Sequence, residues 1–344
     1  MPLIFFVMQC FALFFGVDAT ATLESLPTCC HESLNDVLSN YFPDVSRNEI
    51  SITPLIGGHS NTCLKICTPT QCYVLRIKDK DASEKSLKRE LFAMQEAANL
   101  GIAPQVFYVS PDNRAILMDF IEGDTATIAQ MKLSENCARV ADTLRKAHTI
   151  KKNPYFEEDS NETAANVYSA ICENQKIRAQ LDEALKLMWK YNEKLQKFNS
   201  CKVNIHGELN SRNIFITDKN VIFIDWEYTS WEDPFSDLSY LALRLDYDAN
   251  QELLLLKSYL QHMPSADELE RYYLTKKINF AQLCIFFHYF SLKFNQDNKD
   301  LDDRVPLKNW SYYMSLFSDQ PDDEQSLAQF YYDLARCCLN YARE

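Results

Sequence analysis

Four polar side chains could carry out chemistry together, and all lie within residues 204–227: His206, Glu208, Asn213 and Asp225. This stretch reads as three short strands rich in Ile, Phe and Val, which favour a pleated surface. The four side chains therefore stand at or beside strand ends, where they can converge while a hairpin holds them rigid. Phosphoryl transfer needs one carboxylate to position the attacking hydroxyl, and an Asn and a second carboxylate to hold magnesium.

The pattern is similar to the HGDLxxxN motif of the aminoglycoside phosphotransferase and choline kinase family, in which a following strand ends in Asp, an aromatic residue and Glu. Residues 223–228 (FIDWEY) and 233–238 (DPFSDL) resemble the choline kinase branch in particular. The resemblance implies an α+β, two-lobed protein-kinase-like fold. Its N-lobe would hold a small antiparallel β-sheet, and its C-lobe would be mainly helical.

The same resemblance assigns catalytic roles to all four residues, with Asn213 and Asp225 as the Mg²⁺ ligands. One departure matters: the family has Asp at the base position, and this chain has Glu208. A misplacement of about an ångström can cost about a hundredfold in rate. Because Asn213, Asp225 and Arg76 are retained, we expect an active enzyme. A pseudokinase that binds nucleotide and acts through partners is the alternative.

The upstream segment supplies candidates for ATP binding. Gly57 and Gly58 precede a strand, and such a turn can bring backbone N–H groups close to phosphates or can be a plain hairpin turn. By resemblance, Ser60 and Asn61 of this loop would contact the nucleotide. Arg76, on the next strand, would grip the phosphates bidentately.

A helical pattern over residues 86–94 places Glu90 where the family pairs a helix carboxylate with the strand cation; a solvated helix residue is the alternative. Residues 115–123 resemble the strand and hinge between the lobes. There the main chain of Asp119, Phe120 and Ile121 would pair with adenine.

These motifs set the expected organisation. Residues 22–121 would form a nucleotide-binding N-lobe, and residues 122–344 a C-lobe for catalysis and substrate binding. Helical patterns at 175–198 and 251–262 support the second lobe. Residues 1–21 form an apolar segment that is either an export signal or an over-long start. We expect a cytoplasmic protein, since the reaction needs ATP, and no membrane span.

The acceptor is less constrained. Tyr228 lies where choline kinases have an aromatic residue that packs on the quaternary ammonium, a cation–π contact. Glu227 could add negative charge, and Trp310 could help to form an aromatic cage, although aromatic clusters are more often core. Against a complete cage, His288 and Ser291 occupy the places of two tryptophans in the family. Arg244 also falls near the sequence position at which choline kinases carry a carboxylate.

Composition agrees with this interpretation. A chain of 344 residues suits two lobes around a cleft, and its formal net charge of −13 argues against a nucleic-acid partner. The 12 cysteines show no metal or disulfide signature, so we expect small buried thiols. The sequence thus predicts transfer of the ATP γ-phosphate, with Mg²⁺, to a hydroxyl of a small, cationic amino alcohol such as choline or ethanolamine. Aminoglycoside- and thiamine-type acceptors are the alternatives.

Overall fold

The computed structural model divides the chain into two compact units. It describes residues 28–55, 61–78, 82–156, 159–198, 201–295, 301–304, 306–316, 320–321 and 323–344. The first unit contains the described residues up to Thr125 together with Asn153–Tyr155 and Asn213–Thr229, and the second contains Ala126–Lys152, Phe156–Arg212 and Ser230–Glu344.

This division differs from the expected boundary because two later segments, Asn153–Tyr155 and Asn213–Thr229, belong to the first unit. The first break, after Thr125, lies close to the expected lobe boundary at 121/122, but Asn213–Thr229 joins the first unit instead of the C-lobe. The physical reason is local bonding: the backbone N–H of Phe223 donates to the oxygen of Ile102 over 2.8 Å, and Arg76 contacts Asp225. The segment that carries the expected metal ligands therefore belongs to the same unit as the strands that were expected to bind nucleotide. The apolar segment 1–21 lies outside the described residues.

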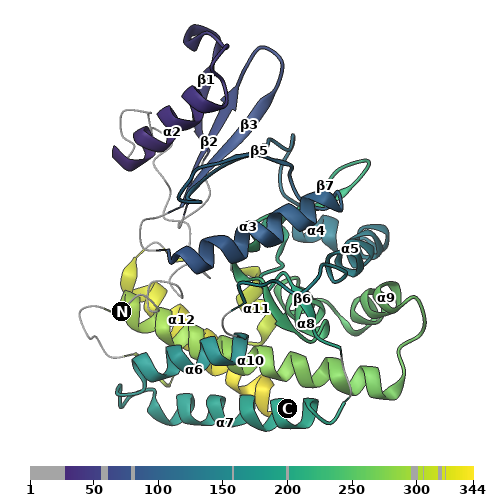
Figure 1. Cartoon of the computed structure of the whole chain (residues 1–344). Helices are drawn as coiled ribbons and strands as arrows, with labels where there is room; N and C mark the ends of the chain where they lie inside the picture. The colour runs from purple at the N-terminus through teal and green to yellow at the C-terminus, as the bar shows by residue number, and fades with distance from the viewer. Residues whose placement is uncertain are drawn as a thin grey trace. The chain divides into compact units, whose positions relative to one another are not determined.

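A five-stranded antiparallel sheet in the order β1-β2-β3-β5-β4 organises the first unit (Figure 1). A β-bulge interrupts the pairing of β4 with β5. The strands are β1 (Ser51–Leu55), β2 (Asn61–Cys67), β3 (Cys72–Lys78), β4 (Val106–Val109) and β5 (Ala115–Asp119). The central strand β3 is buried at most positions, and its neighbours on either side fix its register.

Two helices accompany this sheet. Helix α2 (Thr28–Asn40) precedes the short helix η2 (Arg47–Glu49) and packs on β3 and β5, and its Leu34 and Val37 belong to the hydrophobic core of the sheet. Helix α3 (Glu84–Asn99) begins at Ser83, whose hydroxyl accepts a hydrogen bond from the Ser86 N–H over 3.1 Å. That N-cap bond satisfies one of the four N–H groups that a helix start leaves without a partner.

One expectation about cysteines is wrong. Cys67 and Cys72 form a disulfide, with their Cα atoms 4.0 Å apart. They are directly opposite each other at the end of the β2–β3 hairpin, so the antiparallel register brings the two sulfur atoms together. The eight other cysteines whose state the structure describes are free thiols, and five of them are buried.

The three short strands predicted within residues 204–227 are all present. Strand β7 (Ile214–Ile216) pairs with β8 (Val221–Phe223) through the predicted turn, and the helix η4 (Trp226–Tyr228) follows. Strand β6 (Val203–Ile205) belongs to the second unit, where it pairs with β9 (Ser230–Glu232).

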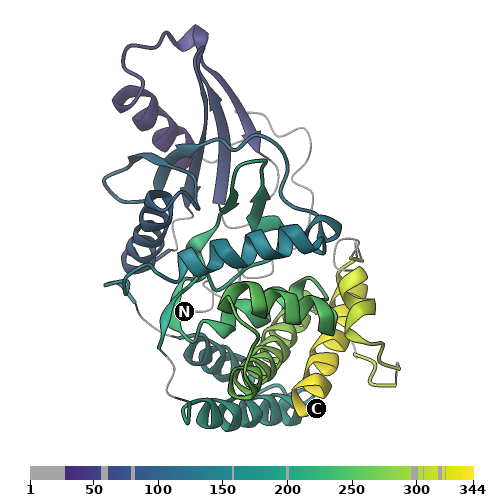
Figure 2. The same ribbon diagram turned by 90° about the vertical axis from the view of Figure 1, so that its right-hand side faces the viewer.

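The second unit is mainly helical. Its helices are α4 (Ile128–Met131), α5 (Ser134–Ala147), α6 (Ser160–Ile171), α7 (Arg178–Leu195), α8 (Phe235–Arg244), α9 (Ala249–Leu260), α10 (Ala266–Phe294), α11 (Trp310–Ser315) and α12 (Glu324–Arg343), with the short helix η3 (Ser211–Asn213) at its border with the first unit. Helices α7 and α9 confirm the two helical patterns in the sequence. Helix α10 is central: it packs on α6, α7, α8 and α12, and Figure 2 shows these helices gathered around it.

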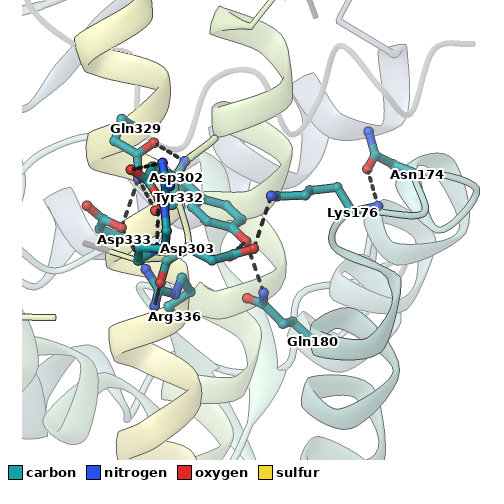
Figure 3. A network of polar contacts seen from close by, with 10 residues as sticks. Asn174, Lys176, Gln180, Asp302, Asp303, Gln329, Tyr332, Asp333 and Arg336 are labelled. Carbon is teal, nitrogen blue, oxygen red and sulfur yellow. Dashed lines mark hydrogen bonds and ion pairs between the residues drawn. The ribbon is translucent and has the colours of Figure 1, made fainter. Parts of the chain in front are cut away.

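A network of polar contacts joins several segments of the helical unit (Figure 3). The Asp303 carboxylate accepts a hydrogen bond from the Tyr332 hydroxyl, and its Oδ2 lies 3.0 Å from the Lys176 ammonium. Arg336 donates to the backbone oxygen of Asp303 over 2.8 Å and pairs with Asp333 over 3.1 Å. The network thus fastens the segment before α11 to α12 and, through Lys176, to the residues just before α7. Among the described residues, no helix is long and apolar enough to cross a membrane.

Candidate active site

Arg76 and Glu90 meet in the first unit, one from β3 and the other from α3. Both are buried, at 6% and 1% exposure, and the Arg76 guanidinium bonds to Glu90 Oε1. The guanidinium also approaches the Met94 sulfur at 3.6 Å. A strand cation and a helix carboxylate are thus in direct contact, in the arrangement that the sequence resemblance implied.

Asp225 completes this contact from the end of the β7–β8 hairpin. Its Oδ1 lies 3.4 Å from Arg76 Nη1. The residue has left-handed backbone angles, φ 64° and ψ 67°, which only a few per cent of residues other than Gly adopt. Asn213 lies at the start of the same hairpin, and its backbone oxygen accepts the Ile224 N–H over 3.0 Å. The two expected metal ligands therefore belong to one hairpin of the first unit.

A second cation, Lys78, lies beside Arg76. Its ammonium is 2.9 Å from Glu90 Oε2 and 2.5 Å from Glu227 Oε2. Glu227 is itself buried, at 4% exposure. The negative charge that we expected Glu227 to offer to a cationic substrate is therefore already paired with Lys78.

The carboxylates of Glu90, Asp225 and Glu227 each place an oxygen within 4.8 Å of the other two. Carboxylate oxygens at such spacing suit a hard cation such as Mg²⁺. The donor chemistry of the first unit therefore fits the ion that the phosphotransferase motif implies, with Asp225 as the carboxylate that carries no bond to Lys78 among the described contacts.

Burial and charge act against each other in this cluster. Burial alone would raise the pKa of Glu90, but Arg76 and Lys78 lower it to about 2. Burial raises the pKa of Asp225, although Arg76 and Lys78 oppose the change. Burial, and then the charge of Asp225, raises the pKa of Glu227 to about 7. Three carboxylates share two cations here, so a further positive charge would be favourable.

In the second unit, Asp237 organises the loop after β6. Its carboxylate accepts the N–H groups of His206 and Gly207 over 2.7 and 2.9 Å, and His148 Nε2 lies 3.0 Å away. Burial would raise the pKa of Asp237, but the hydrogen bond and charge of His148 lower it. The ring of His206 is fully buried, and its Nδ1 accepts the Glu208 N–H over 3.3 Å. These bonds fix the backbone that presents Glu208.

Glu208 interacts electrostatically with Arg212, and Arg212 in turn lies close to a second arginine. Arg212, four residues further along the same loop, interacts with Glu208 and with Arg244 at the end of α8. Burial of the Arg212 side chain, and then the positive charge of Arg244, lower the pKa of Arg212. The expected base is therefore accompanied by positive charge in its own unit.

The expected nucleotide contacts are only partly described. Asn61 begins β2 and pairs in register with Lys78, while Ser60 lies outside the described residues. Asp119 ends β5, and its N–H donates to the Gln105 oxygen over 2.9 Å. Phe120 follows, with the Lys65 ammonium 3.8 Å from its ring centre, and then the half-buried Ile121. Contact of these residues with adenine stays a prediction.

The expected acceptor residues do not all belong to one unit. Tyr228 is half-buried in η4, in the first unit. Trp310 is buried at 5% exposure in the second unit, where its indole N–H donates to the Leu243 oxygen over 2.9 Å. His288 and Ser291 are fully buried on α10. In the structure, Trp310, His288 and Ser291 are therefore core side chains of the helical unit.

Sequence reasoning missed Lys78 and Asp237. Lys78 follows Arg76 by two positions on one strand, so the period-2 alternation places both on one face. Asp237 falls within the motif 233–238, but the sequence does not show that its carboxylate holds two backbone N–H groups of a loop thirty residues earlier.

Comparison with known proteins decides the family. Residues 51–269 match the model of the phosphotransferase enzyme family, described as APH. This match spans more than half of the chain. The chain belongs to the phosphotransferase enzyme family.

Individual relatives agree with this assignment. Protein LicA of Haemophilus influenzae is 22% identical over 242 residues, which cover 67% of this chain and 68% of LicA. Among solved structures, a choline/ethanolamine kinase family protein from Mesorhizobium loti has a TM-score of 0.63 at 19% identity, covering 91% of this chain and 99% of its own. Choline kinase LicA from Streptococcus pneumoniae has a TM-score of 0.62 at 18% identity, covering 90% and 100%. At these identities the solved structures show the fold, which confirms the predicted kinase-like architecture of this phosphotransferase.

Proposed function

We propose that this phosphotransferase is an ATP-dependent kinase that transfers the γ-phosphate to a hydroxyl of a small amino alcohol, of the choline or ethanolamine type. The observation that carries the proposal is the contact of Arg76 with both Glu90 and Asp225. A guanidinium held between a helix carboxylate and a carboxylate at the metal position is placed to grip phosphate oxygens. Two related structures, LicA in complex with AMP and ADP-bound aminoglycoside phosphotransferase APH(2'')-Ib, support a nucleotide substrate.

Each residue has one task in this proposal. Asp225 and Asn213 would hold Mg²⁺, which would neutralise charge on the phosphates. Arg76 orients the phosphates, and Glu90 orients Arg76. Glu208 orients the acceptor hydroxyl and accepts its proton late in the transfer. His206 does not need to reach the substrate, because its ring receives the Glu208 N–H and so fixes the loop.

The acceptor could instead carry a negative group. Arg212 places positive charge near Glu208, and Arg244 places it near Arg212, whereas a quaternary ammonium would be recognised by aromatic and acidic groups. Tyr228 supports the cationic acceptor, and the two arginines favour a hydroxy acid or a hydroxy amino acid. Both kinds of acceptor keep the same phosphoryl-transfer site.

An acceptor panel tests the function. ATP consumption is measured with choline, ethanolamine, a hydroxy amino acid, an aminoglycoside and thiamine, each with and without Mg²⁺. Turnover of any of them with magnesium supports the kinase, and the preferred acceptor identifies the class. Nucleotide binding without turnover of any acceptor would favour a pseudokinase.

The matched variant is Asp225→Asn. Asn tolerates left-handed backbone angles well, so the hairpin should keep its conformation while the metal loses a carboxylate ligand. We expect turnover to fall by orders of magnitude with an unchanged circular dichroism spectrum. Normal turnover of this variant would remove the basis of the site.

A further inference from the structure

Lys78 contacts two members of the carboxylate cluster of the first unit, which consists of Glu90, Asp225 and Glu227. It extends from β3 on the same face as Arg76, two residues earlier, and is buried at 6% exposure. Its ammonium contacts one oxygen of Glu90 at 2.9 Å and one oxygen of Glu227 at 2.5 Å. Glu90 therefore gives one oxygen to each of two cations, since its other oxygen bonds to Arg76.

The three carboxylates of this cluster are close enough to share one metal ion. The Lys78 ammonium already contacts two of them. The third, that of Asp225, has a longer ion-pair contact of 3.4 Å to Arg76, its one ion pair among the described residues. A divalent ion could bind all three carboxylates only if it displaced a buried ammonium. Such a displacement leaves a buried charge without a counter-ion, which is strongly unfavourable.

The main chain supports the same arrangement. Arg89 on α3 donates to the backbone oxygen of Glu227 over 2.9 Å, and Asn153 donates to the backbone oxygen of Arg89 over 2.8 Å. The helix η4 is thus held by its backbone to α3 and by its Glu227 side chain to β3. Glu227 cannot turn toward a metal at Asp225 without breaking its bond to Lys78.

We propose that Lys78 acts as an internal cation: it occupies Glu90 and Glu227 and so leaves Asp225 as the carboxylate that binds the metal together with the nucleotide. Lys78 is a positioning residue in this proposal, because it acts through the two carboxylates. Its catalytic consequence rests on the kinase function proposed above. The effect of Lys78 on metal binding in the absence of nucleotide does not depend on that function.

Lys78→Met tests this directly. The variant keeps the length of the side chain and removes its charge, so Glu90 and Glu227 become available to a divalent ion. Because a buried charge lies a few ångströms from the metal position, we expect Mn²⁺ to bind the nucleotide-free variant about tenfold more tightly, or more. The turnover number should fall, since the metal would then be held by the wrong carboxylates. The KM for ATP should change less than the turnover number.

The measurement is a titration of nucleotide-free protein with Mn²⁺, followed by calorimetry and by the electron paramagnetic resonance signal of the free ion. Lys88→Met is the control: Lys88 lies on the exposed face of α3, where it pairs with Glu84, so the variant makes the same change in net charge. It should bind Mn²⁺ as the wild type does. Lys78→Arg, which keeps the charge, should also remain close to the wild type.

The double variant Lys78→Met/Glu227→Gln identifies the carboxylate. If Glu227 is released by the loss of Lys78, the double variant should lose most of the gain in Mn²⁺ affinity. Should Lys78→Met be unfolded without metal, millimolar Mn²⁺ is expected to restore its fold, since binding to the native state stabilises it. Restoration supports the proposal, and a variant that stays unfolded overturns it.

Folded Lys78→Met protein that binds Mn²⁺ no more tightly than Lys88→Met overturns the proposal, whatever its activity. So does a gain that persists in the double variant. A wild-type protein inert toward every acceptor would count against the kinase function alone, because the metal titration needs neither nucleotide nor acceptor.

Discussion

Replacing Glu90 by Gln should destabilise the first unit strongly, and the structure gives the size of the effect. The change keeps the shape of the side chain but leaves Arg76 and Lys78 buried without their shared carboxylate. In the folded protein the pKa of Glu90 falls from its ordinary 4.5 to about 2. At 1.36 kcal/mol per pKa unit this difference is worth about 3 kcal/mol. Removal of one partner from a buried ion pair costs about 3–5 kcal/mol, which agrees.

The pH dependence has a definite sign. The pKa of Glu90 is lower in the folded state than in the unfolded state, so its contribution is fully present above about pH 5. It is lost as the pH falls through the folded value of about 2. Since Gln does not titrate, the difference in stability between wild type and variant should shrink as the pH falls from about 5 toward 3.

Urea denaturation followed by circular dichroism, with hydrogen exchange on peptides of α3, measures this difference at several pH values. Glu84→Gln is the control, because Glu84 belongs to the same helix and pairs with Lys88 at the exposed surface. Surface pairs of this kind contribute little. A Glu90→Gln variant as stable as Glu84→Gln would refute the buried three-charge arrangement, and a difference that does not change with pH would refute the depressed pKa.

The sequence predicted the parts of the site that depend on short-range order. Arg76 lies on an apolar strand, Glu90 recurs with the buried positions of an amphipathic helix, and Asp225 ends a strand that a tight turn joins to the one before. Strand alternation and helix period fix the faces of these elements. The contact of Arg76 with both carboxylates then follows from the kinase-like order of the motifs.

Other contacts could not be predicted, because they depend on register and long-range pairing. Lys78 and Glu227 are separated by 149 positions, and no local pattern connects them. The disulfide between Cys67 and Cys72 requires the two residues to be directly opposite in the hairpin, and a slip of one residue would move one sulfur to the other face. The separation of five residues between Cys67 and Cys72, around a short turn, was the only sequence signal for this disulfide.

Arg76→Ala should raise the KM for ATP more than the KM for the acceptor, because the guanidinium would contact phosphates and not the alcohol. Steady-state kinetics with each substrate varied in turn measure both constants. Equal effects on the two KM values would contradict this prediction. Asp237→Asn should destabilise the second unit by about 1–3 kcal/mol, since one of the N–H groups of His206 and Gly207 loses its acceptor. Urea denaturation measures that loss, which should shrink as the pH falls through the depressed pKa of Asp237. Glu208→Gln should lower the turnover number by orders of magnitude with nucleotide affinity almost unchanged, because this carboxylate accepts the hydroxyl proton and does not hold the nucleotide. Glu208→Asp is the sharper change. The loop that presents Glu208 is held by the bonds of Asp237 to His206 and Gly207, so it cannot advance to compensate for a side chain shortened by one methylene. If the site is adapted to Glu, this variant should be slower by up to about a hundredfold, the cost of a misplacement of about an ångström. A wild-type protein that is inert, binds ATP and gains activity with Asp would instead mean that the site has decayed and that the pseudokinase alternative is right.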